Sequence, residues 1–381
     1  MKHFAILALS ALCLAACTAQ SETETEEKKD GLIQVPMPMA EGYVDFDSLY
    51  VIERVVVPEV TEHSVVKNPH RAFWVAEDSV LVVFSKGNQQ ISVFAADGKF
   101  LNNVGAHGSG DGEYSEVSDI VVNRRKVYVF DNAAQKMLVY GLDGQLLNTI
   151  DSKFSFRSFA KADNGFWLYA CHRSNNEGGF ALIHADETLQ DTIACFFPQH
   201  PDFVNVEHRT NFVIHSDKAY FFWPTSNVIY RLNGDEVAPY VTIDFGENTP
   251  NYVYLSRLGE ESVYVQYMED NRCYRFRSVH ACNDFMTFVY RRYADSEVTS
   301  PNFAYYNRLS GNSMASPAKM SGENPVLRAS FNIGETDDCL ILMTKTKGKA
   351  EVRNFLADRY GIVLPQGNSN PAFLFCRPML E

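Results

Sequence analysis

The sequence predicts an all-β fold, a six-bladed β-propeller in which strands from the two ends of the chain close the last blade. Three observations support this prediction. A sequence unit recurs along the chain, aspartate-glycine turns separate short apolar runs, and the 27 phenylalanines and 19 tyrosines favour strands over helices. Propeller blades are units of four short strands that recur every ~40–50 residues, so a repeat of that length indicates this fold.

The repeat is clearest early in the chain. The segment that begins at Ile91 aligns without a gap with the segment that begins at Met137, an offset of 46 residues. Each contains an aspartate followed by glycine, at Asp97 and Asp143, and this pair predicts a tight type I′ hairpin because such a turn needs positive φ. Weaker forms of the turn occur at 185–187 and 232–234, so that the successive spacings are 46, 43 and 47.

Six repeat units can be counted. They cover residues 71–105, 117–150, 156–193, 209–245 and 252–293, and a sixth begins near residue 326. In the sixth unit we predict strands over 328–333, 339–344 and 372–376, and a short helix over 350–360 where apolar residues recur at helical spacing. Residues 50–57 then supply the missing outer strand, which ties the chain ends into one blade and removes an open sheet edge. Two separate domains are the alternative, but no linker interrupts the repeats.

Residues 294–325 are rich in serine, asparagine, proline and glycine around Phe303, Tyr305 and Tyr306. Long loops of this kind are often functional. We expect an inserted loop here, which could lie over the channel as a lid or could be tolerated extra length.

The first 16 residues resemble a lipoprotein secretion signal. Lys2 gives the positive start, Phe4 to Leu14 form an apolar run too short to span a bilayer, and the tetrapeptide that ends at Cys17 resembles the lipobox. We therefore predict that residues 1–16 are removed and that the Cys17 thiol is lipidated. An ordinary signal peptide that happens to contain a cysteine is the alternative.

Residues 17–40 are predicted to be the lipidated cysteine and a flexible acidic tether, and residues 41–381 the propeller. Residues 18–30 contain no large apolar side chain, so they cannot offset the entropy lost on ordering. Thr18, where an aspartate would favour the inner membrane, indicates an outer-membrane lipoprotein of the cell envelope. The acidic run resembles export tags of Gram-negative surface lipoproteins, so we also expect surface exposure.

Charge and cysteine content narrow the partners. The net charge of −13 repels nucleic acid and anionic lipid, so we expect no nucleic-acid partner and membrane contact through the lipid anchor alone. No zinc-site spacing, nucleophile elbow or EF-hand loop occurs, and no metal, cofactor or catalytic residue is predicted. The sequence does not decide between disulfides and buried free thiols for the cysteines after Cys17. These are Cys171, Cys195, Cys273, Cys282, Cys339 and Cys376.

The run from Phe94 to Gly105, followed by the glycine-rich loop 108–114, resembles NHL-repeat propellers. More closely, it is similar to six-bladed propeller lipoproteins of uncharacterised function from gut-type Gram-negative bacteria, whose loop usually has proline where Asp111 stands. Residues 370–375 resemble the closing strand of that family. The resemblance covers nearly all of the mature chain and implies the fold but not the function. The loop lacks the phosphate-binding and dinucleotide patterns, so we expect it to be a structural turn.

Register alignment of the repeats gives one candidate site. With the second unit as reference, Val117 corresponds to Arg71, Arg209 and Arg328 of the first, fourth and sixth units. This position starts the innermost strand beside the channel mouth, where three guanidiniums would favour a carboxylate, sulfate or phosphate. The alternative is that these arginines pair with carboxylates of neighbouring blades. Loops between the second and third strands add further candidates: Asp131, Asn132, His172, Arg173 and Trp223.

These features predict non-catalytic binding of a small acidic or carbohydrate ligand, or of an envelope protein. Trp223, which Pro224 follows, could stack on a sugar ring. The competing class is an enzyme, a lyase or glycoside hydrolase with its site at the channel mouth, and a structural member of an envelope complex is a third. A convergent set of carboxylates or a metal at that mouth would distinguish the enzyme.

Overall fold

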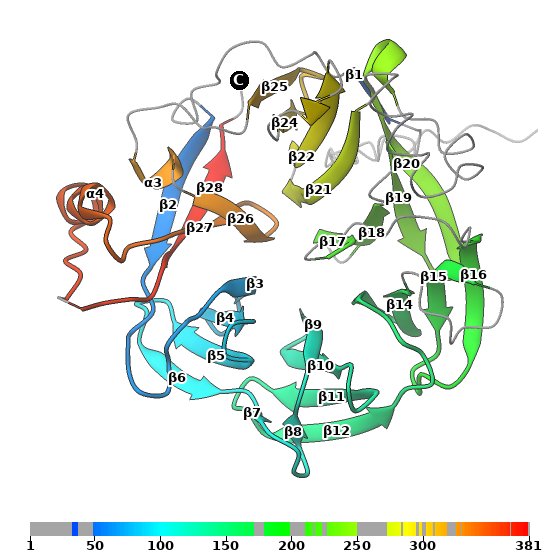
Figure 1. Cartoon of the computed structure of the whole chain (residues 1–381), viewed down its shortest axis with the longest axis horizontal. Coiled ribbons are helices and arrows are strands. Elements are labelled where there is room, and N and C mark those ends of the chain that lie inside the picture. The colour runs from blue at the N-terminus through cyan, green and yellow to red at the C-terminus, as the bar shows by residue number, and fades with distance from the viewer. Residues whose placement is uncertain are drawn as a thin grey trace, which may run out of the picture. The chain divides into compact units, whose positions relative to one another are not determined.

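The chain folds as a six-bladed β-propeller, with six small sheets arranged around a central axis (Figure 1). The predicted fold is therefore confirmed. Each sheet extends outward from one inner strand, and most consecutive strands within a blade are antiparallel. The computed structural model describes residues 33–36, 49–170, 179–198, 210–215, 218–222, 227–249, 273–282, 285–294, 297–298, 302–307, 309–317, 325–328, 330–365 and 367–379.

Blades 1 to 3 are regular units whose four strands follow one another from the axis outward. Blade 1 contains β3 (Pro69–Val75), β4 (Val80–Ser85), β5 (Gln90–Ala95) and β6 (Phe100–Asn103). Blade 2 contains β9 (Val117–Asn123), β10 (Lys126–Asp131), β11 (Lys136–Gly141) and β12 (Leu146–Asp151). Blade 3 contains β13 (Ser158–Ala162), β14 (Gly165–Tyr169), β15 (Phe180–Ala185) and β16 (Thr192–Pro198). The glycine-rich connection between blades 1 and 2 holds the short parallel pair β7 (Ala106–His107) and β8 (Glu113–Tyr114).

Blade 4 has a fifth strand that comes from the N-terminal region. Its four antiparallel strands are β17 (Phe212–His215), β18 (Lys218–Phe222), β19 (Val228–Asn233) and β20 (Glu236–Asp244). The additional strand, β1 (Ile33–Pro36), pairs in parallel with the outer strand β20. These four residues lie inside the segment for which the sequence predicts a flexible tether. The structure differs there because the outer edge of β20 offers backbone hydrogen-bonding groups that β1 can satisfy.

Blade 5 corrects the prediction of an inserted loop over residues 294–325. It contains β21 (Cys273–Cys282), β22 (Phe285–Ala294), β24 (Asn302–Asn307) and β25 (Ser313–Pro317), and the two-residue β23 (Glu297–Val298) pairs with β22. Residues 302–307 and 313–317 are therefore outer strands of the blade. Phe303 and Tyr305 pack toward blade 6 and Ala304 and Tyr306 pack toward blade 4, a period of two that is typical of a strand with both faces covered.

Blade 6 closes the ring in the predicted way. From the axis outward it contains β26 (Ser330–Glu335), β27 (Leu340–Thr344), β28 (Ala372–Pro378) and β2 (Tyr50–Val56). The N-terminal strand β2 is antiparallel to the C-terminal strand β28, and Arg377 hydrogen-bonds Glu53 between them. The predicted helix is also present, as α4 (Ala350–Tyr360), which ends at Gly361 with φ of +67°. Among the described residues, no helix is long and apolar enough to cross a bilayer.

Asn370 fastens this closure from just before β28. Its Oδ1 accepts a hydrogen bond from the Val66 amide at 2.8 Å, and its Nδ2 donates to the carbonyl oxygens of Ser64 (2.9 Å), Glu59 (3.0 Å) and Pro58 (3.3 Å). Asn370 is fully buried. One side chain therefore satisfies four backbone groups in the connection between β2 and β3.

The aspartate-glycine turns form hairpins, but the predicted type I′ geometry is wrong. In the turn after β5, only Gly98 has positive φ, at +89°, whereas a type I′ turn needs two such residues. The Gly98 amide donates to the Ala95 carbonyl and the Ala95 amide donates to the Lys99 carbonyl. This pattern is a type I turn followed by a bulge at glycine, and it repeats around Gly144, whose φ is +83°.

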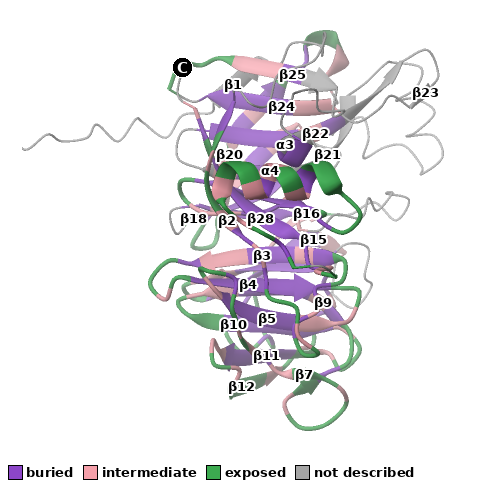
Figure 2. Cartoon of the chain, turned by 90° about the vertical axis from the view of Figure 1, so that its left-hand side faces the viewer, coloured by how far each residue is buried: buried purple, intermediate pink, exposed green. Residues whose placement is uncertain are grey.

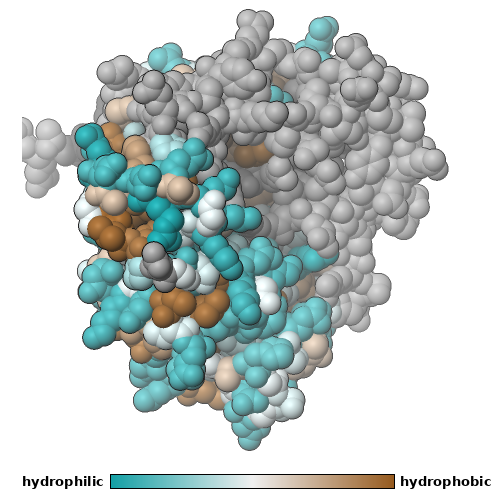
Figure 3. Space-filling view, turned by 60° about the vertical axis from the view of Figure 1, so that its left-hand side comes forward, coloured by the Kyte–Doolittle hydropathy of each residue, from teal (hydrophilic) through white to brown (hydrophobic). Residues whose placement is uncertain are grey.

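The core lies between the blades. Six clusters of buried apolar side chains each join two neighbouring blades, as for example Phe84 and Val129 join blades 1 and 2. In Figure 2 the middle strands β4 and β5 are mostly purple, whereas the outer strand β12 and much of α4 are exposed. Figure 3, which brings the α4 side forward, shows apolar side chains in separate patches among hydrophilic ones. Among the described cysteines, Cys195, Cys339 and Cys376 are free thiols.

Candidate functional site

The inner strands place Arg71 and Asp119 at equivalent positions of blades 1 and 2. Arg71 lies opposite Phe84, and Asp119 lies opposite Phe130, which is the residue 46 positions after Phe84. The sequence-based match of Arg71 with Val117 is therefore wrong. The turn between β3 and β4 contains residues 76–79 but the corresponding turn of blade 2 only residues 124–125, so the gapless offset fails across this turn.

Arg71 makes an ion pair with the neighbouring blade. Its Nη1 donates to Asp119 Oδ1 at 2.9 Å, and its guanidinium lies 4.9 Å from the centre of the Phe73 ring. Asp119 also accepts hydrogen bonds from the amides of Ile120 (2.9 Å) and Phe159 (3.3 Å), so it joins blades 1, 2 and 3. Burial raises the pKa of Asp119 to about 6, although Arg71 and the two amides act to lower it. For Arg71, the alternative of pairing between blades is the one found.

Asp131 is held by backbone N–H groups of its own turn and of the connection that precedes β9. It accepts hydrogen bonds from the amides of Ser115 (2.6 Å), Glu116 (3.2 Å), Ala133 (3.0 Å) and Ala134 (3.1 Å). Burial alone would raise the pKa of this carboxyl, but the hydrogen bonds outweigh burial and hold the pKa below its usual range. The backbone N–H of Asn132 also donates to the Glu116 carbonyl oxygen, at 2.8 Å. Both residues thus fix the connection between blades 1 and 2, and their positions as ligand contacts stay a prediction.

The remaining predicted site residues are His172, Arg173, Arg209, Trp223 and Arg328. His172, Arg173, Arg209 and Trp223 lie outside the described residues. Arg328 is the last residue of helix α3 (Pro325–Arg328) and does not start the inner strand, which begins at Ser330. The prediction for Arg328 is wrong on this point because Pro325, with its fixed φ, begins a helical turn ahead of the strand.

Sequence reasoning missed a second set of polar contacts, at the end of the ring where the first and second strands of each blade join. Here Asp78 and Arg125 join blades 1 and 2 at 2.7 Å. Arg124 and Asp163 join blades 2 and 3 at 2.8 Å. We call this end the inner-hairpin end, defined by the turns at residues 76–79, 124–125, 163–164 and 336–339.

Two histidines make the corresponding contacts on the other side of the axis. His280 of β21 pairs with Glu335 of β26, which joins blades 5 and 6. His215, at the end of β17 in blade 4, has its Nδ1 3.5 Å from Oδ1 of Asp337 in blade 6. Because blades 4 and 6 are not neighbours, this contact lies at the axial opening. A sequence signal for it is hard to find, since the two partners come from different units and differ in register.

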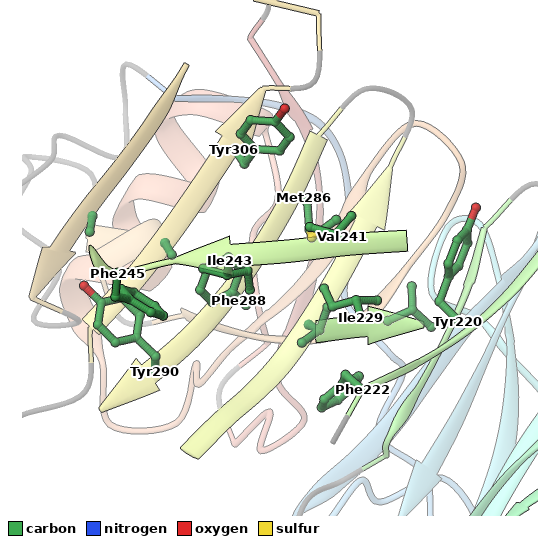
Figure 4. Close-up of a cluster of buried hydrophobic side chains, with 14 residues drawn as sticks. Tyr220, Phe222, Ile229, Val241, Ile243, Phe245, Met286, Phe288, Tyr290 and Tyr306 are labelled. Carbon is green, nitrogen blue, oxygen red and sulfur yellow. The ribbon is translucent and has the colours of Figure 1, made fainter. Parts of the chain in front are cut away.

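A pocket opens beside His215, between blades 4 and 5. It is small, with a cavity volume of about 20 Å³, which is room for about one water molecule. Figure 4 shows Ile229 of β19 and Met286 of β22 within the buried apolar cluster between these blades. The lining side chains are Val213, His215, Tyr220, Ile229, Tyr240, Val279, Ala281 and Met286. Within the described part of the chain, no three histidine, cysteine or acidic residues are grouped to hold a metal ion.

Residues 54–344 match the family model described as Domain of unknown function (DUF4934). The chain belongs to the DUF4934 family. A structure from Bacteroides fragilis described as a "Putative exported protein" is similar to this DUF4934 protein, with a TM-score of 0.72 and 17% identity over 92% of this chain and 100% of that chain. A member of the duf4221 family from Bacteroides vulgatus has a TM-score of 0.51 and 10% identity, over 87% of this chain and 98% of that one. At these identities the similarities show the fold alone. No curated protein matches the sequence.

Proposed function

We propose that this DUF4934 protein is a lipid-anchored, non-catalytic binding module of the cell envelope. The pocket between blades 4 and 5 is the observation that carries the proposal. Seven of its eight lining side chains, all except His215, are apolar or aromatic, and such a lining suits contact with a ligand. Its lining residues all lie on strands of the two blades.

The sequence supports the envelope location. Cys17 follows the apolar signal core at the lipobox position, and Thr18 with the acidic run favours the outer membrane and its surface. The description of the similar Bacteroides fragilis protein as exported agrees with this part of the proposal.

The proposed ligand is a small molecule, with an envelope protein as the second possibility. The predicted acidic ligand loses the support of Arg71, which already has a carboxylate partner, and of Arg328, which does not start an inner strand. An uncharged ligand such as a carbohydrate suits the pocket better than an anion does, since none of the lining residues is a lysine or an arginine.

A ligand screen tests binding and chemistry together. Thermal melts of the wild type with a panel of sugars, organic acids and aromatic compounds should reveal at least one stabilising compound. That compound should not stabilise Ala281→Leu, in which the larger side chain occupies the pocket. Mass spectrometry should recover the compound unchanged, whereas cleavage would favour the lyase or glycoside hydrolase class.

Fractionation tests the anchor. Wild-type protein should sediment with membranes and carry a lipid on the mature N-terminus at Cys17. Cys17→Ala protein should be released or remain unprocessed. Equal membrane fractions for the two proteins, with no lipid mass, would contradict the proposed anchoring.

A further inference from the structure

Blade 4 contains a strand that the propeller does not need. Blades 1, 2, 3 and 6 are complete with four strands, and β17 to β20 give blade 4 the same four. The outer strand β20 pairs with residues 228–233 of β19, so it is held in the sheet without β1. The fifth strand, β1, therefore adds something other than a missing part of the blade.

The pairing between β1 and β20 is short and one-sided. It joins residues 33–36 to residues 241–244, and in the described part of the chain β1 has no strand on its other side. Pro36 has no N–H to donate, so the ladder ends there. A contact of this size can open without disturbing blade 4, because the other four strands keep their own hydrogen bonds.

The sequence of β1 nevertheless suits this edge. Register places Ile33 and Val35 opposite two residues that are buried between blades 4 and 5, Val241 and Ile243. Isoleucine and valine favour strands, whereas residues 18–30 contain no large apolar side chain. The pairing is therefore specific to one segment of the region that precedes β2.

The state of β1 decides where the chain from Cys17 joins the propeller. With β1 paired, that chain joins at blade 4, and with β1 released it joins at β2 of blade 6. There are 15 residues between Cys17 and Ile33, and 32 between Cys17 and Tyr50. An extended chain spans at most ~3.3–3.6 Å per residue, so pairing shortens the greatest possible reach from ~115 Å to ~55 Å.

The direction of β1 also matters. Because the pairing is parallel, the N-terminal end of β1 points toward the N-terminal end of β20, which follows the turn at residues 234–235. Blade 4 lies across the central axis from blade 1 (Figure 1). An anchor reached through Ile33 therefore lies, on average, nearer to blade 4 than to blade 1.

We propose that β1 is a strap that turns blade 4 toward the membrane and keeps the propeller within ~55 Å of the lipid at Cys17. This proposal rests on the lipid anchor of the proposed function and adds the side of the propeller that faces the membrane. Release of β1 moves the point of attachment to blade 6 and roughly doubles the reach.

A disulfide between the paired strands tests the pairing in the full-length protein without a membrane. Neighbouring strands lie ~4.8 Å apart, which is within the ~4.4–6.8 Å between the Cα atoms of a disulfide. Gln34→Cys combined with Thr242→Cys should therefore cross-link under mild oxidation, since these residues are opposite each other. Gln34→Cys combined with Glu236→Cys, in the part of β20 that β1 does not cover, should not. Gln34→Cys alone controls for the native cysteines, and equal cross-linking in the two pairs would overturn the proposal.

Energy transfer to the membrane tests the orientation. Lipidated full-length protein is bound to phosphatidylcholine vesicles that contain an acceptor-labelled lipid, with a fluorescent amino acid at position 96 or 235. Ala96 and Asp235 are exposed in the turns between the third and fourth strands of blades 1 and 4. Transfer should be more efficient from position 235 than from position 96.

Variants of β1 connect this orientation to the strap. Gln34→Pro with Val35→Pro removes both inner N–H groups of β1 and should remove the difference between the two positions. Gln34→Thr with Val35→Ile keeps the N–H groups and the preference for a strand, and it should keep the difference. The oxidised Gln34→Cys, Thr242→Cys protein should also keep it.

The outcomes separate the strap from the anchor on which it rests. Vesicle-bound wild type with equal transfer from positions 96 and 235 would overturn the orientation while leaving the anchor in place. A wild-type difference in the proline variant would overturn the role of β1. Protein that does not stay with the vesicles would overturn both the anchor and the strap.

Discussion

Asn370 gives the sharpest test of how the ring is closed. Removing its amide in Asn370→Ala leaves the Val66 N–H and the Ser64 and Pro58 carbonyls without their buried hydrogen bonds. Each buried group left unsatisfied costs about 1–3 kcal/mol. Water that enters the vacated space recovers part of this loss, so we expect the free energy of unfolding to fall by about 3–5 kcal/mol.

The charged variant separates hydrogen bonding from packing. Asn370→Asp has the same shape, but its carboxylate faces three carbonyl oxygens and cannot donate to them. The loss at neutral pH should exceed that of Asn370→Ala, and acidification should recover part of it because a protonated carboxyl can donate one hydrogen bond.

Urea unfolding followed by circular dichroism measures both effects. Asn148→Ala is the control, since Asn148 is exposed and, among the described residues, its side chain bonds only the adjacent Thr149 backbone N–H. Its unfolding free energy should change by no more than about 0.5 kcal/mol. If Asn370→Ala unfolds at the same urea concentration as Asn148→Ala, the reasoning that this amide fastens the closure is wrong.

Three further predictions concern turns and buried ionisable groups. Gly144→Ala should lower the free energy of unfolding by several kcal/mol, since its φ is +83° and the new Cβ would lie 2.4 Å from a backbone oxygen. Gly234→Ala, at φ +59° with open space around it, should lower it by only ~1 kcal/mol. Equal urea midpoints for the two variants would contradict this. Because burial raises the folded-state pKa of Asp119 to about 6, stability should fall as pH rises from ~4 through 6, and Asp119→Asn should reduce that slope in melts across this range. Burial lowers the pKa of His184, so stability should fall as pH drops below ~6.5 toward the folded-state value. His184→Phe should abolish this fall and raise the free energy of unfolding by ~1–2 kcal/mol. Neither ring nitrogen of His184 has a hydrogen-bond partner among the described residues, and phenylalanine would keep the stacking on Trp167. An unchanged pH profile would refute the assignment.

Much of the fold could be predicted because its signals are local and repeated. Period-two apolar runs and the turns at Gly98 and Gly144 recur at a constant offset. The last blade lacked one strand in the sequence count, so an outer strand had to come from the N-terminal side. Blade 5 was harder, because the polar composition of the 294–325 segment concealed the alternation in β24.

The candidate site was less predictable because it depends on register and on contacts between units. A turn two residues longer in blade 1 than in blade 2 moved the equivalent of Arg71 from Val117 to Asp119, and no local pattern shows which carboxylate a guanidinium will meet. One missed contact did have a signal. Gln89 and Gln135 are 46 residues apart, and each accepts a hydrogen bond from the next repeat, from Val117 N at 2.8 Å and Ser155 Oγ at 2.9 Å.

The closure of blade 6 also sets an order of events during synthesis. Strand β2 precedes the inner strand of every blade, but its only described partner strand, β28, is among the last residues to emerge. Blades 1 to 5 can form hairpins as the chain arrives, whereas the outer strand of blade 6 must wait for a contact of very high sequence separation, and such contacts form slowly. If Cys17 is lipidated as proposed and the chain is delivered N-terminus first, the lipid would be acquired before the ring is complete. A nascent chain arrested before residue 372 would therefore be tethered yet open, with one sheet edge exposed to proteases and to other unfinished chains.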